Sequence, residues 1–94
     1  MFHTLHRVKR FSVIGPYALN VEFSDGTEQS IDFQPVLRGA MYGPLRDPNL
    51  FKAVTLDGEV GTLTWPNGAD FDAATLHDWP EVSAELAERA KGWE

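Results

Sequence analysis

The sequence predicts an α+β fold. An antiparallel sheet of about five strands, a three-strand meander plus a hairpin, carries C-terminal helices packed on one face. Apolar and polar residues alternate between turn signals over much of the chain, as they do in half-buried strands. Toward the C-terminus the apolar residues instead follow the period of an amphipathic helix. The 94 residues leave room for a single domain, over residues 1–94.

The first predicted strand covers residues 7–15 and contains an irregularity. Phe11 and Val13 alternate, whereas Val8 falls out of phase with them. A bulge near Lys9 adds one residue to the strand and would restore the phase. We therefore expect a bulged strand whose charged residues, Arg7, Lys9 and Arg10, face solvent and make it a protected edge of the sheet.

The next two strands form the clearest pattern in the chain. Residues 17–23 place four apolar side chains on one face, and residues 27–33 continue the alternation. Between them, Asp25 and Gly26 predict a type I′ turn, because both residue types tolerate the positive φ angles that this turn requires. Residues 7–33 therefore predict an antiparallel meander.

The middle of the chain is less regular. Residues 35–38 predict one helical turn that ends at Gly39, and residues 40–47 predict a loop. Asp47 followed by Pro48 predicts a helix start, with Asp at the N-cap and Pro at the first helical position.

A hairpin and two helices complete the predicted fold. Residues 53–56 and 60–65 predict the hairpin strands, and Pro66 ends the second strand because proline cannot donate to a strand ladder. Asp70 or Asp72 is then the predicted N-cap of a helix that runs to about residue 79.

Pro80 restarts the chain as an amphipathic helix over about residues 80–92. The apolar seam of this helix consists of Val82, Leu86, Ala90 and Trp93. The strand faces and the first helix together predict a buried core. The predicted core residues are Phe11, Val13, Leu19, Val21, Phe23, Ile31, Phe33, Leu45, Phe51, Val54, Leu63 and Leu76.

Charge restricts the partners that the protein can bind. The chain has 14 acidic and 8 basic residues and a formal net charge of −6, which repels phosphate backbones. We therefore expect no binding to duplex DNA near physiological salt. The N-terminal arm is nevertheless basic, with Arg7, Lys9 and Arg10, so nucleic-acid contact through this arm is a weaker alternative function.

No segment has the length and apolar character of a signal peptide or of a membrane span. The chain also contains no cysteine, as is typical of proteins in a reducing compartment. We expect a cytoplasmic protein without membrane contact.

The sequence lacks the motifs of several kinds of chemistry. It contains no GxxxxGK[ST], GxGxxG, GxSxG or HExxH pattern. His3, His6 and His77 lack the companions of a zinc site, and we expect them at the surface. We therefore predict a protein that is not an enzyme, with no catalytic residue, metal or cofactor.

The favoured function is a non-enzymatic protein-interaction module that binds a protein partner or a second copy of itself. An unpaired strand edge can accept a strand from another chain, and we expect such an edge in the hairpin over residues 53–65. The helix seam with Val82, Leu86 and Trp93 is the second predicted contact surface.

An alternative function is a small-molecule binding or enzymatic domain. It would use a cluster of carboxylate, amide and indole groups beside the turns. This predicted polar cluster consists of Asp32, Trp65, Asn67 and Asp70. A deep cavity bordered by these four residues would favour this alternative.

The order of these signals resembles a known family. The chain carries Phe-Ser-Asp-Gly at 23–26, Leu-Arg-Asp-Pro at 45–48 and Trp-Pro-Asn-Gly-Ala-Asp at 65–70. Over about residues 8–79 it resembles the bacterial family called domain of unknown function 2442. The resemblance implies a small cytoplasmic α+β domain without established catalytic residues. It also implies a gene neighbourhood shared with a second uncharacterised family, domain of unknown function 4160, in a toxin–antitoxin-like arrangement.

Overall fold

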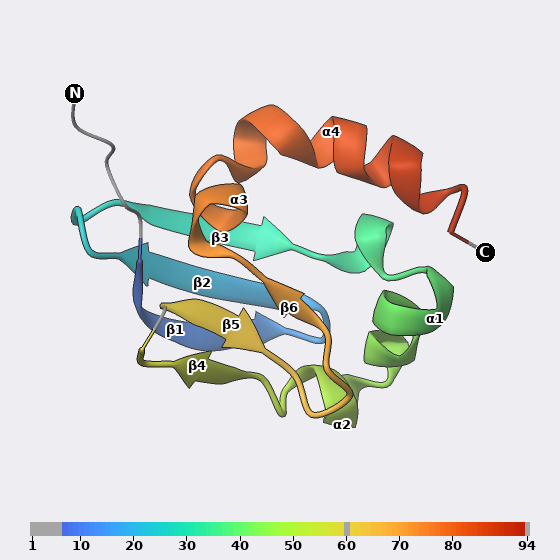
Figure 1. Ribbon diagram of the computed structural model, residues 1–94, viewed down its shortest axis with the longest axis horizontal. Helices are drawn as coiled ribbons and strands as arrows, with labels where there is room; N and C mark the ends of the chain where they lie inside the picture. The colour runs from blue at the N-terminus through green and yellow to red at the C-terminus, as the bar shows by residue number, and fades with distance from the viewer. Residues whose placement is uncertain (1–6, 60, 94) are drawn as a thin grey trace.

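The computed structural model describes residues 7–59 and 61–93 (Figure 1). The strands are β1 (Val8–Gly15), β2 (Ala18–Phe23), β3 (Glu28–Asp32), β4 (Thr55–Asp57), β5 (Thr62–Thr64) and β6 (Asp70–Phe71). The helices are η1 (Gln34–Val36), α1 (Gly39–Tyr42), η2 (Gly43–Arg46), α2 (Pro48–Phe51), α3 (Ala73–His77) and α4 (Trp79–Ala90). The predicted α+β fold is confirmed.

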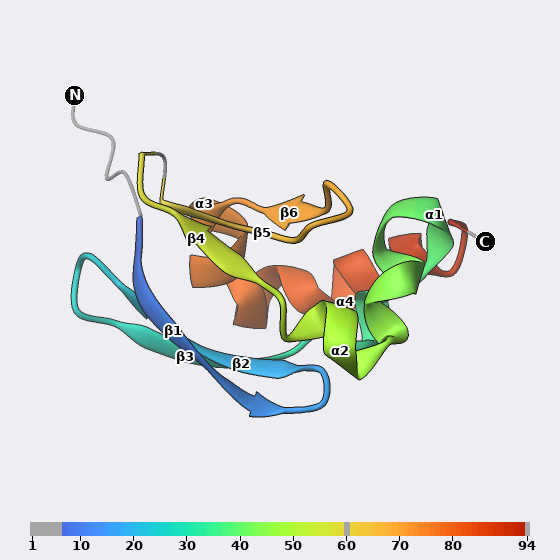
Figure 2. The same ribbon diagram turned by 90° about the horizontal axis from the view of Figure 1, so that it is seen from below.

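The strands form two antiparallel sheets of three strands, in the orders β1-β2-β3 and β4-β5-β6. The sequence predicts one sheet of about five strands, and the difference has two causes. The hairpin of β4 and β5 forms its own layer instead of extending the meander, as Figure 2 shows. The two-residue strand β6 also pairs with β5, and it is too short to show an alternating pattern.

The first sheet has the predicted order and face. The register of β1 against β2 shifts between Val8 and Arg10, which confirms the predicted bulge. Along β2 the side chains of Leu19, Val21 and Phe23 are fully buried, while the intervening residues are half-buried. The helix α3 packs on β2 and β3 and covers this face.

The hairpin turn between β2 and β3 differs from the predicted type I′ turn. Within this turn only Gly26 has a positive φ, of 89°, so the φ angle of Asp25 is negative. The Gly26 N–H donates to the Phe23 carbonyl at 3.0 Å, and the Phe23 N–H donates to the Thr27 carbonyl at 2.8 Å. This pattern is a type I turn followed by a glycine bulge. The Asp25 carboxylate accepts the Thr27 N–H at 3.0 Å, which holds Asp25 in its turn conformation.

Two predictions for the middle of the chain are wrong. Gly39 begins α1 instead of ending a helical turn, and the predicted loop over residues 40–47 contains α1 and η2. Tertiary packing explains the difference, because Gly39 lies so close to Trp93 that a Cβ at Gly39 would be 2.8 Å from the Trp93 Cβ. The predicted helix start is confirmed, since the Asp47 carboxylate accepts the Asn49 N–H at 2.9 Å at the start of α2.

The predicted N-cap role of Asp70 is also wrong. Asp70 lies in β6, opposite Thr64 of β5. Asp72 occupies the N-cap position of α3, but its carboxylate accepts the Thr75 hydroxyl at 2.5 Å in place of a backbone N–H. Pro80 lies in the first turn of α4, as predicted.

The core lies between the two sheets and the helices. Every predicted core residue is buried except Phe11, which is half-buried, and Val13, which is 45% exposed. Both lie on β1, which curves away from the second sheet toward its C-terminal end in Figure 2, so the second sheet covers this half of the strand less closely. The core also includes residues outside the predicted set. They are Val8, Val36, Leu37, Trp65, Ala69, Phe71, Ala73, Trp79 and Ala90.

The two sheets are joined at the start of β1. The Val8 N–H donates to the Gly61 carbonyl at 3.0 Å. The Arg7 guanidinium donates to the carbonyls of Gly58 at 2.7 Å and Glu59 at 2.9 Å. These bonds fix the turn between β4 and β5 against the first sheet.

Candidate functional site

Trp93 follows α4 and lines two cavities. Its side chain remains 38% exposed, and its ring lies 5.6 Å from the ring of Tyr42. Gly39 has φ +81°, and a Cβ there would lie 2.8 Å from the Trp93 Cβ. Only glycine allows this close approach without displacement. Trp93 is therefore held against α1.

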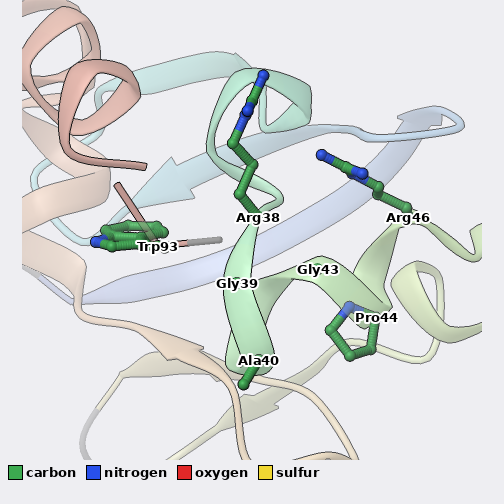
Figure 3. Close-up of a pocket in the computed structure, with 7 residues that line it drawn as sticks. All are labelled: Arg38, Gly39, Ala40, Gly43, Pro44, Arg46 and Trp93. Atoms are coloured by element: carbon green, nitrogen blue, oxygen red, sulfur yellow. The ribbon is translucent and has the colours of Figure 1, made fainter. Parts of the chain in front are cut away.

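The first cavity lies between α1, η2 and Trp93 and has a volume of about 570 Å³. Its charged lining residues are Arg38 and Arg46. Figure 3 shows Arg38 between Trp93 and Arg46, with the nitrogen end of Arg46 directed toward Arg38. The Tyr17 hydroxyl donates to the Arg46 carbonyl at 2.6 Å and positions the backbone of this residue.

The second cavity, of about 370 Å³, is also lined by Trp93. Asp70, Asp72 and Leu86 are among its other lining residues. The Tyr42 hydroxyl donates to the Asp70 carbonyl at 2.9 Å. Burial, together with the negative charges of Asp70 and Asp72, raises the pKa of Tyr42, so this phenol stays protonated and remains a donor.

The predicted polar cluster does not converge on one cavity. Trp65 is buried, and its indole N–H donates to the Phe51 carbonyl at 2.8 Å. The Asn67 amide donates to the Met41 carbonyl at 2.9 Å and connects the turn after β5 to α1. Both side chains therefore stabilise the fold.

The two carboxylates of that cluster line different cavities. Asp70 borders the cavity beside Trp93, whereas Asp32 borders a third cavity of about 320 Å³ together with Trp79 and Ser83. The Asp32 carboxylate also accepts the Gln34 N–H at 3.0 Å, which supports the turn into η1. The structure brings Asp70 together with Leu86 and Trp93 instead.

The apolar seam of α4 faces the body of the domain. Ala90 is fully buried, Leu86 is half-buried and packs against the core, and Val82 is half-buried. Val82 and Leu86 also line a small cavity of about 190 Å³. The seam therefore packs mainly against the rest of the domain, and Trp93 is its most exposed member.

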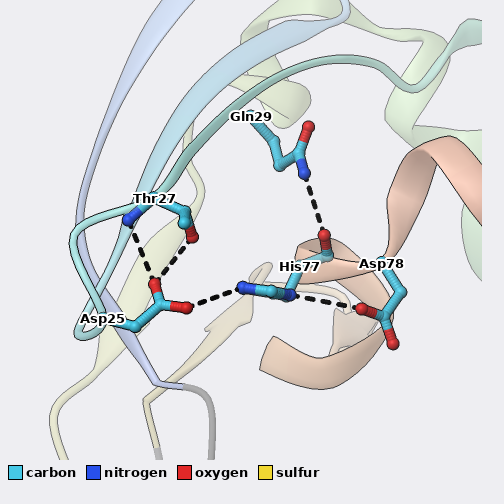
Figure 4. A network of polar contacts seen from close by, with 5 residues as sticks. All are labelled: Asp25, Thr27, Gln29, His77 and Asp78. Atoms are coloured by element: carbon cyan, nitrogen blue, oxygen red, sulfur yellow. Dashed lines mark hydrogen bonds and ion pairs between the residues drawn. The ribbon is translucent and has the colours of Figure 1, made fainter.

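A polar network connects the turn between β2 and β3 to the end of α3 (Figure 4). The His77 imidazole lies between two carboxylates, with Nε2 2.9 Å from Asp25 and Nδ1 3.2 Å from Asp78. The Gln29 amide donates to the His77 carbonyl at 2.9 Å. Only the doubly protonated imidazolium donates to both carboxylates at once.

The hydrogen bonds and charges of this network shift the pKa values of His77 and Asp25. The hydrogen bond to Asp78 raises the pKa of His77, the Asp25 carboxylate adds to this effect, and partial burial opposes it. Hydrogen bonds from the Thr27 hydroxyl and N–H hold the pKa of Asp25 well below its usual range. Among the described residues, no group of three or more His, Asp and Glu side chains has the arrangement of a metal site. His3 and His6 lie outside the described residues.

The edge strand β1 exposes apolar side chains. Val13 is 45% exposed and Ile14 is 55% exposed, and both lie near the end of the strand. The sequence predicts an unpaired edge in the hairpin of β4 and β5, and β4 is an edge strand of the second sheet. The side chains of Val54 and Leu63 in that region are buried, so β1 exposes more apolar surface than this hairpin does.

The basic residues of the N-terminal arm contact other parts of the chain. Lys9 and Arg10 lie 3.6 Å and 3.5 Å from Glu22, and Arg7 bonds to backbone carbonyls, as described above. Their charges are thus partly compensated within the domain. None of the described helices combines the length and the apolar character that crossing a membrane requires.

Sequence reasoning missed the contribution of Arg38 and Arg46. The two arginines are eight positions apart in a segment predicted to be mainly loop, and no motif marks them. Their proximity to Trp93 depends on a contact between residues more than fifty positions apart. The glycines at 39 and 43 were the only local signal of a close backbone approach.

The fold and these surfaces define a small two-sheet α+β domain with open surface cavities and an edge strand, β1, that exposes apolar side chains. The sequence profile of the family described as "Protein of unknown function (DUF2442)" matches residues 8–80, and the chain belongs to this family. No curated protein and no solved structure matches the chain.

Proposed function

We propose that this protein is a non-enzymatic protein-interaction module of the bacterial cytoplasm. Its finer role is that of an antitoxin-like partner of a small protein encoded beside it, in line with the gene neighbourhood that the family resemblance implies. The observation that carries the proposal is the free edge of β1, where Val13 and Ile14 are about half exposed.

An edge strand offers unpaired N–H and C=O groups to another chain, and soluble proteins usually block such edges with charge or coverage. The first part of β1 follows this rule, because Lys9, Arg10 and the first of two register shifts precede Phe11, while the second shift lies at Ile14. The second part lacks charged residues and carries two exposed apolar side chains. This combination is typical of a strand that pairs with a strand of a partner.

The test replaces Ile14 with lysine and compares this variant with Met41→Lys. Met41 is 48% exposed and lies on α1, so the control adds the same charge at a similarly exposed apolar position. We expect the protein to co-purify with the co-expressed product of the adjacent gene. Ile14→Lys should abolish co-purification, and Met41→Lys should preserve it.

Light scattering at high protein concentration tests the version in which the partner is a second copy. A dimer that Ile14→Lys dissociates would support β1 as the contact. A strict monomer that also fails to co-purify with the adjacent gene product would overturn the proposal. Equal loss of binding in both variants would show that β1 is not the contact surface.

One observation favours a small-molecule function as the second candidate. The cavity beside Trp93 combines two arginine side chains with an aromatic ring, whereas the predicted polar cluster does not converge. Binding there requires no catalysis and is compatible with an interaction module.

A further inference from the structure

We propose that the free edge of β3 and the neighbouring face of α4 form a docking groove for an extended, positively charged segment of a partner protein. The segment adds a strand to the first sheet. This inference does not depend on the contact through β1, because it uses the opposite edge of that sheet. It rests on the unpaired backbone of β3, on the cavity between β3 and α4 and on the charge around this cavity.

The edge of β3 has backbone groups that point away from the sheet. Within the described chain β3 pairs with β2 alone, and the order β1-β2-β3 leaves its other side open. The Phe33 N–H donates to the Tyr17 carbonyl at 2.8 Å, and residues bonded in this way alternate along an antiparallel strand with residues whose backbone groups point outward. The outward residues of β3 are therefore Glu28, Ser30 and Asp32. A strand of another chain can pair with these groups.

A cavity of about 320 Å³ adjoins this edge. Ser30 and Asp32 border it on the side of β3, and Figure 1 shows α4 running beside the end of this strand. The wall on α4 consists of small residues, Ser83, Ala84 and Ala87. The side chains of an added strand would therefore enter the space between β3 and α4 without displacing a large group.

The buried part of the cavity lining is apolar. Val36 and Trp79 line the cavity and are only 1% and 8% exposed. An apolar side chain of an added strand would lose its contact with water against these two residues, which favours binding. The volume lies at the lower end of the range of about 300–1,000 Å³ that is usual for ligand sites, so the space fits side chains of a strand better than a large ligand.

The exposed face of β3 is acidic. Glu28, Ser30 and Asp32 share the face opposite the core, because Ile31 between them is buried. The bond from the Gln34 N–H uses Oδ1 of Asp32 and leaves Oδ2 for a partner. Lysine or arginine on a neighbouring strand would form favourable cross-strand pairs with these carboxylates.

The exposed side of α4 adds to this negative charge. Glu81 lies three positions before Ala84 and Glu88 four positions after it, so both exposed carboxylates are neighbours of Ala84 on the helix surface. Lys91 carries the opposite charge, but it lies 3.2 Å from Glu88 and compensates it. The net charge of −6 also favours a cationic partner.

The same charge disfavours a second copy of this chain in the groove. If two β3 edges paired antiparallel around Ser30, Glu28 of each copy would lie opposite Asp32 of the other, and like charges directly opposite destabilise a sheet. Charged residues on an edge thus block an acidic strand and accept a basic one. The occupant is therefore a segment of a different protein, with basic side chains on one face and apolar side chains on the other.

The test measures chemical shift changes of the full chain on titration with a synthetic peptide, Lys-Val-Lys-Val-Lys, with acetylated and amidated ends. The peptide Glu-Val-Glu-Val-Glu is the control for charge. We expect the lysine peptide to saturate at millimolar concentration and to shift the backbone signals of β3 and α4. It should also slow hydrogen exchange of the Ser30 and Asp32 N–H groups, because these groups become bonded to the added strand. The glutamate peptide should not saturate.

The first pair of variants is Ala84→Arg and Ala74→Arg. Ala84 is exposed and lines the cavity, so an arginine there occupies the space and repels the lysines of the peptide. Ala74 is exposed on α3 and does not line this cavity, so it is the matched control for the added charge. Ala84→Arg should abolish saturation, and Ala74→Arg should bind within about twofold of the wild type.

The second pair is Asp32→Asn and Asp57→Asn. Each of these aspartates ends a strand, and each carboxylate accepts the N–H two residues further on at 3.0 Å. Asparagine keeps this bond and removes the charge. Asp32→Asn should weaken binding of the lysine peptide about two- to fivefold through the lost cross-strand pair, and Asp57→Asn should leave binding unchanged.

Melting curves check that every variant is folded, and the aspartate pair decides alone if Ala84→Arg fails to fold. Absence of saturation by the lysine peptide at millimolar concentration would overturn the proposal, as would equal binding of the glutamate peptide. Shifts confined to β1 would also overturn it, and they would support β1 as the contact surface instead.

Discussion

Gly61→Ala should destabilise the fold through the junction of the two sheets. Gly61 has φ +70°, and a Cβ there would lie 2.8 Å from the Arg7 Cβ and 3.0 Å from the Arg7 Cα. The left-handed backbone costs a non-glycine residue about 1–2 kcal/mol. The forced contact adds about 1–3 kcal/mol, because a backbone atom cannot rotate away. The reduced freedom of the unfolded chain returns about 0.4–1 kcal/mol.

The expected net loss is therefore about 1–5 kcal/mol in the free energy of unfolding, measured by urea titration. Two matched variants separate the contributions. Gly26 has φ +89° and Gly58 has no positive φ, and neither would bring a new Cβ within 4 Å of another group. Gly26→Ala should show the backbone cost and the unfolded-chain effect without a contact, and Gly58→Ala should be neutral or stabilise the fold by up to about 1 kcal/mol. A Gly61→Ala loss no larger than that of Gly26→Ala would refute the close contact with Arg7.

Three further outcomes are expected. Leu19→Ala should lower the free energy of unfolding in urea by about 2–5 kcal/mol, because Leu19 is fully buried, and a loss under about 1 kcal/mol would contradict that burial. His77→Gln should destabilise more at pH 6 than at pH 9 in the same assay. The raised pKa of His77 makes its contribution complete below about pH 6.5 and removes it as pH rises through the folded-state pKa. Equal losses at both pH values would show that His77 is uncharged in the fold. Fluorescence anisotropy at about 150 mM salt should detect no binding to duplex DNA, and sub-micromolar affinity would contradict this expectation.

Local patterns predicted the first sheet well. The alternation along β2, the bulge near Lys9 and the cap at Asp47 each depend on neighbouring residues alone, and the structure confirms all three. The same kind of reasoning failed for Val13. Its place in the alternation depends on the strand, whereas its exposure depends on how β1 curves away from the second sheet.

Longer-range contacts limited the prediction of the site. Asp32 lies at the end of a predicted strand and Asp70 follows a turn signal, but the sequence does not show that they would border different cavities. The sequence predicts a helix end at Gly39, because glycine often has that role. In the structure Gly39 begins α1, and glycine is required there by the close contact with Trp93. A cavity built from segments distant in sequence has no local pattern that predicts it.

The bonds between the start of β1 and the turn before β5 have a consequence for the order of folding. Within the meander, pairs such as Gly15 with Ala18 are close in sequence, so they can form early at a small entropic cost. The contact of Arg7 with Gly58 closes a loop of 51 residues and should form late. Stabilisation gained after the rate-limiting step slows unfolding and has little effect on refolding. The junction of the two sheets therefore acts mainly on the lifetime of the folded protein, and stopped-flow measurements of Gly61→Ala should show faster unfolding with a nearly unchanged refolding rate.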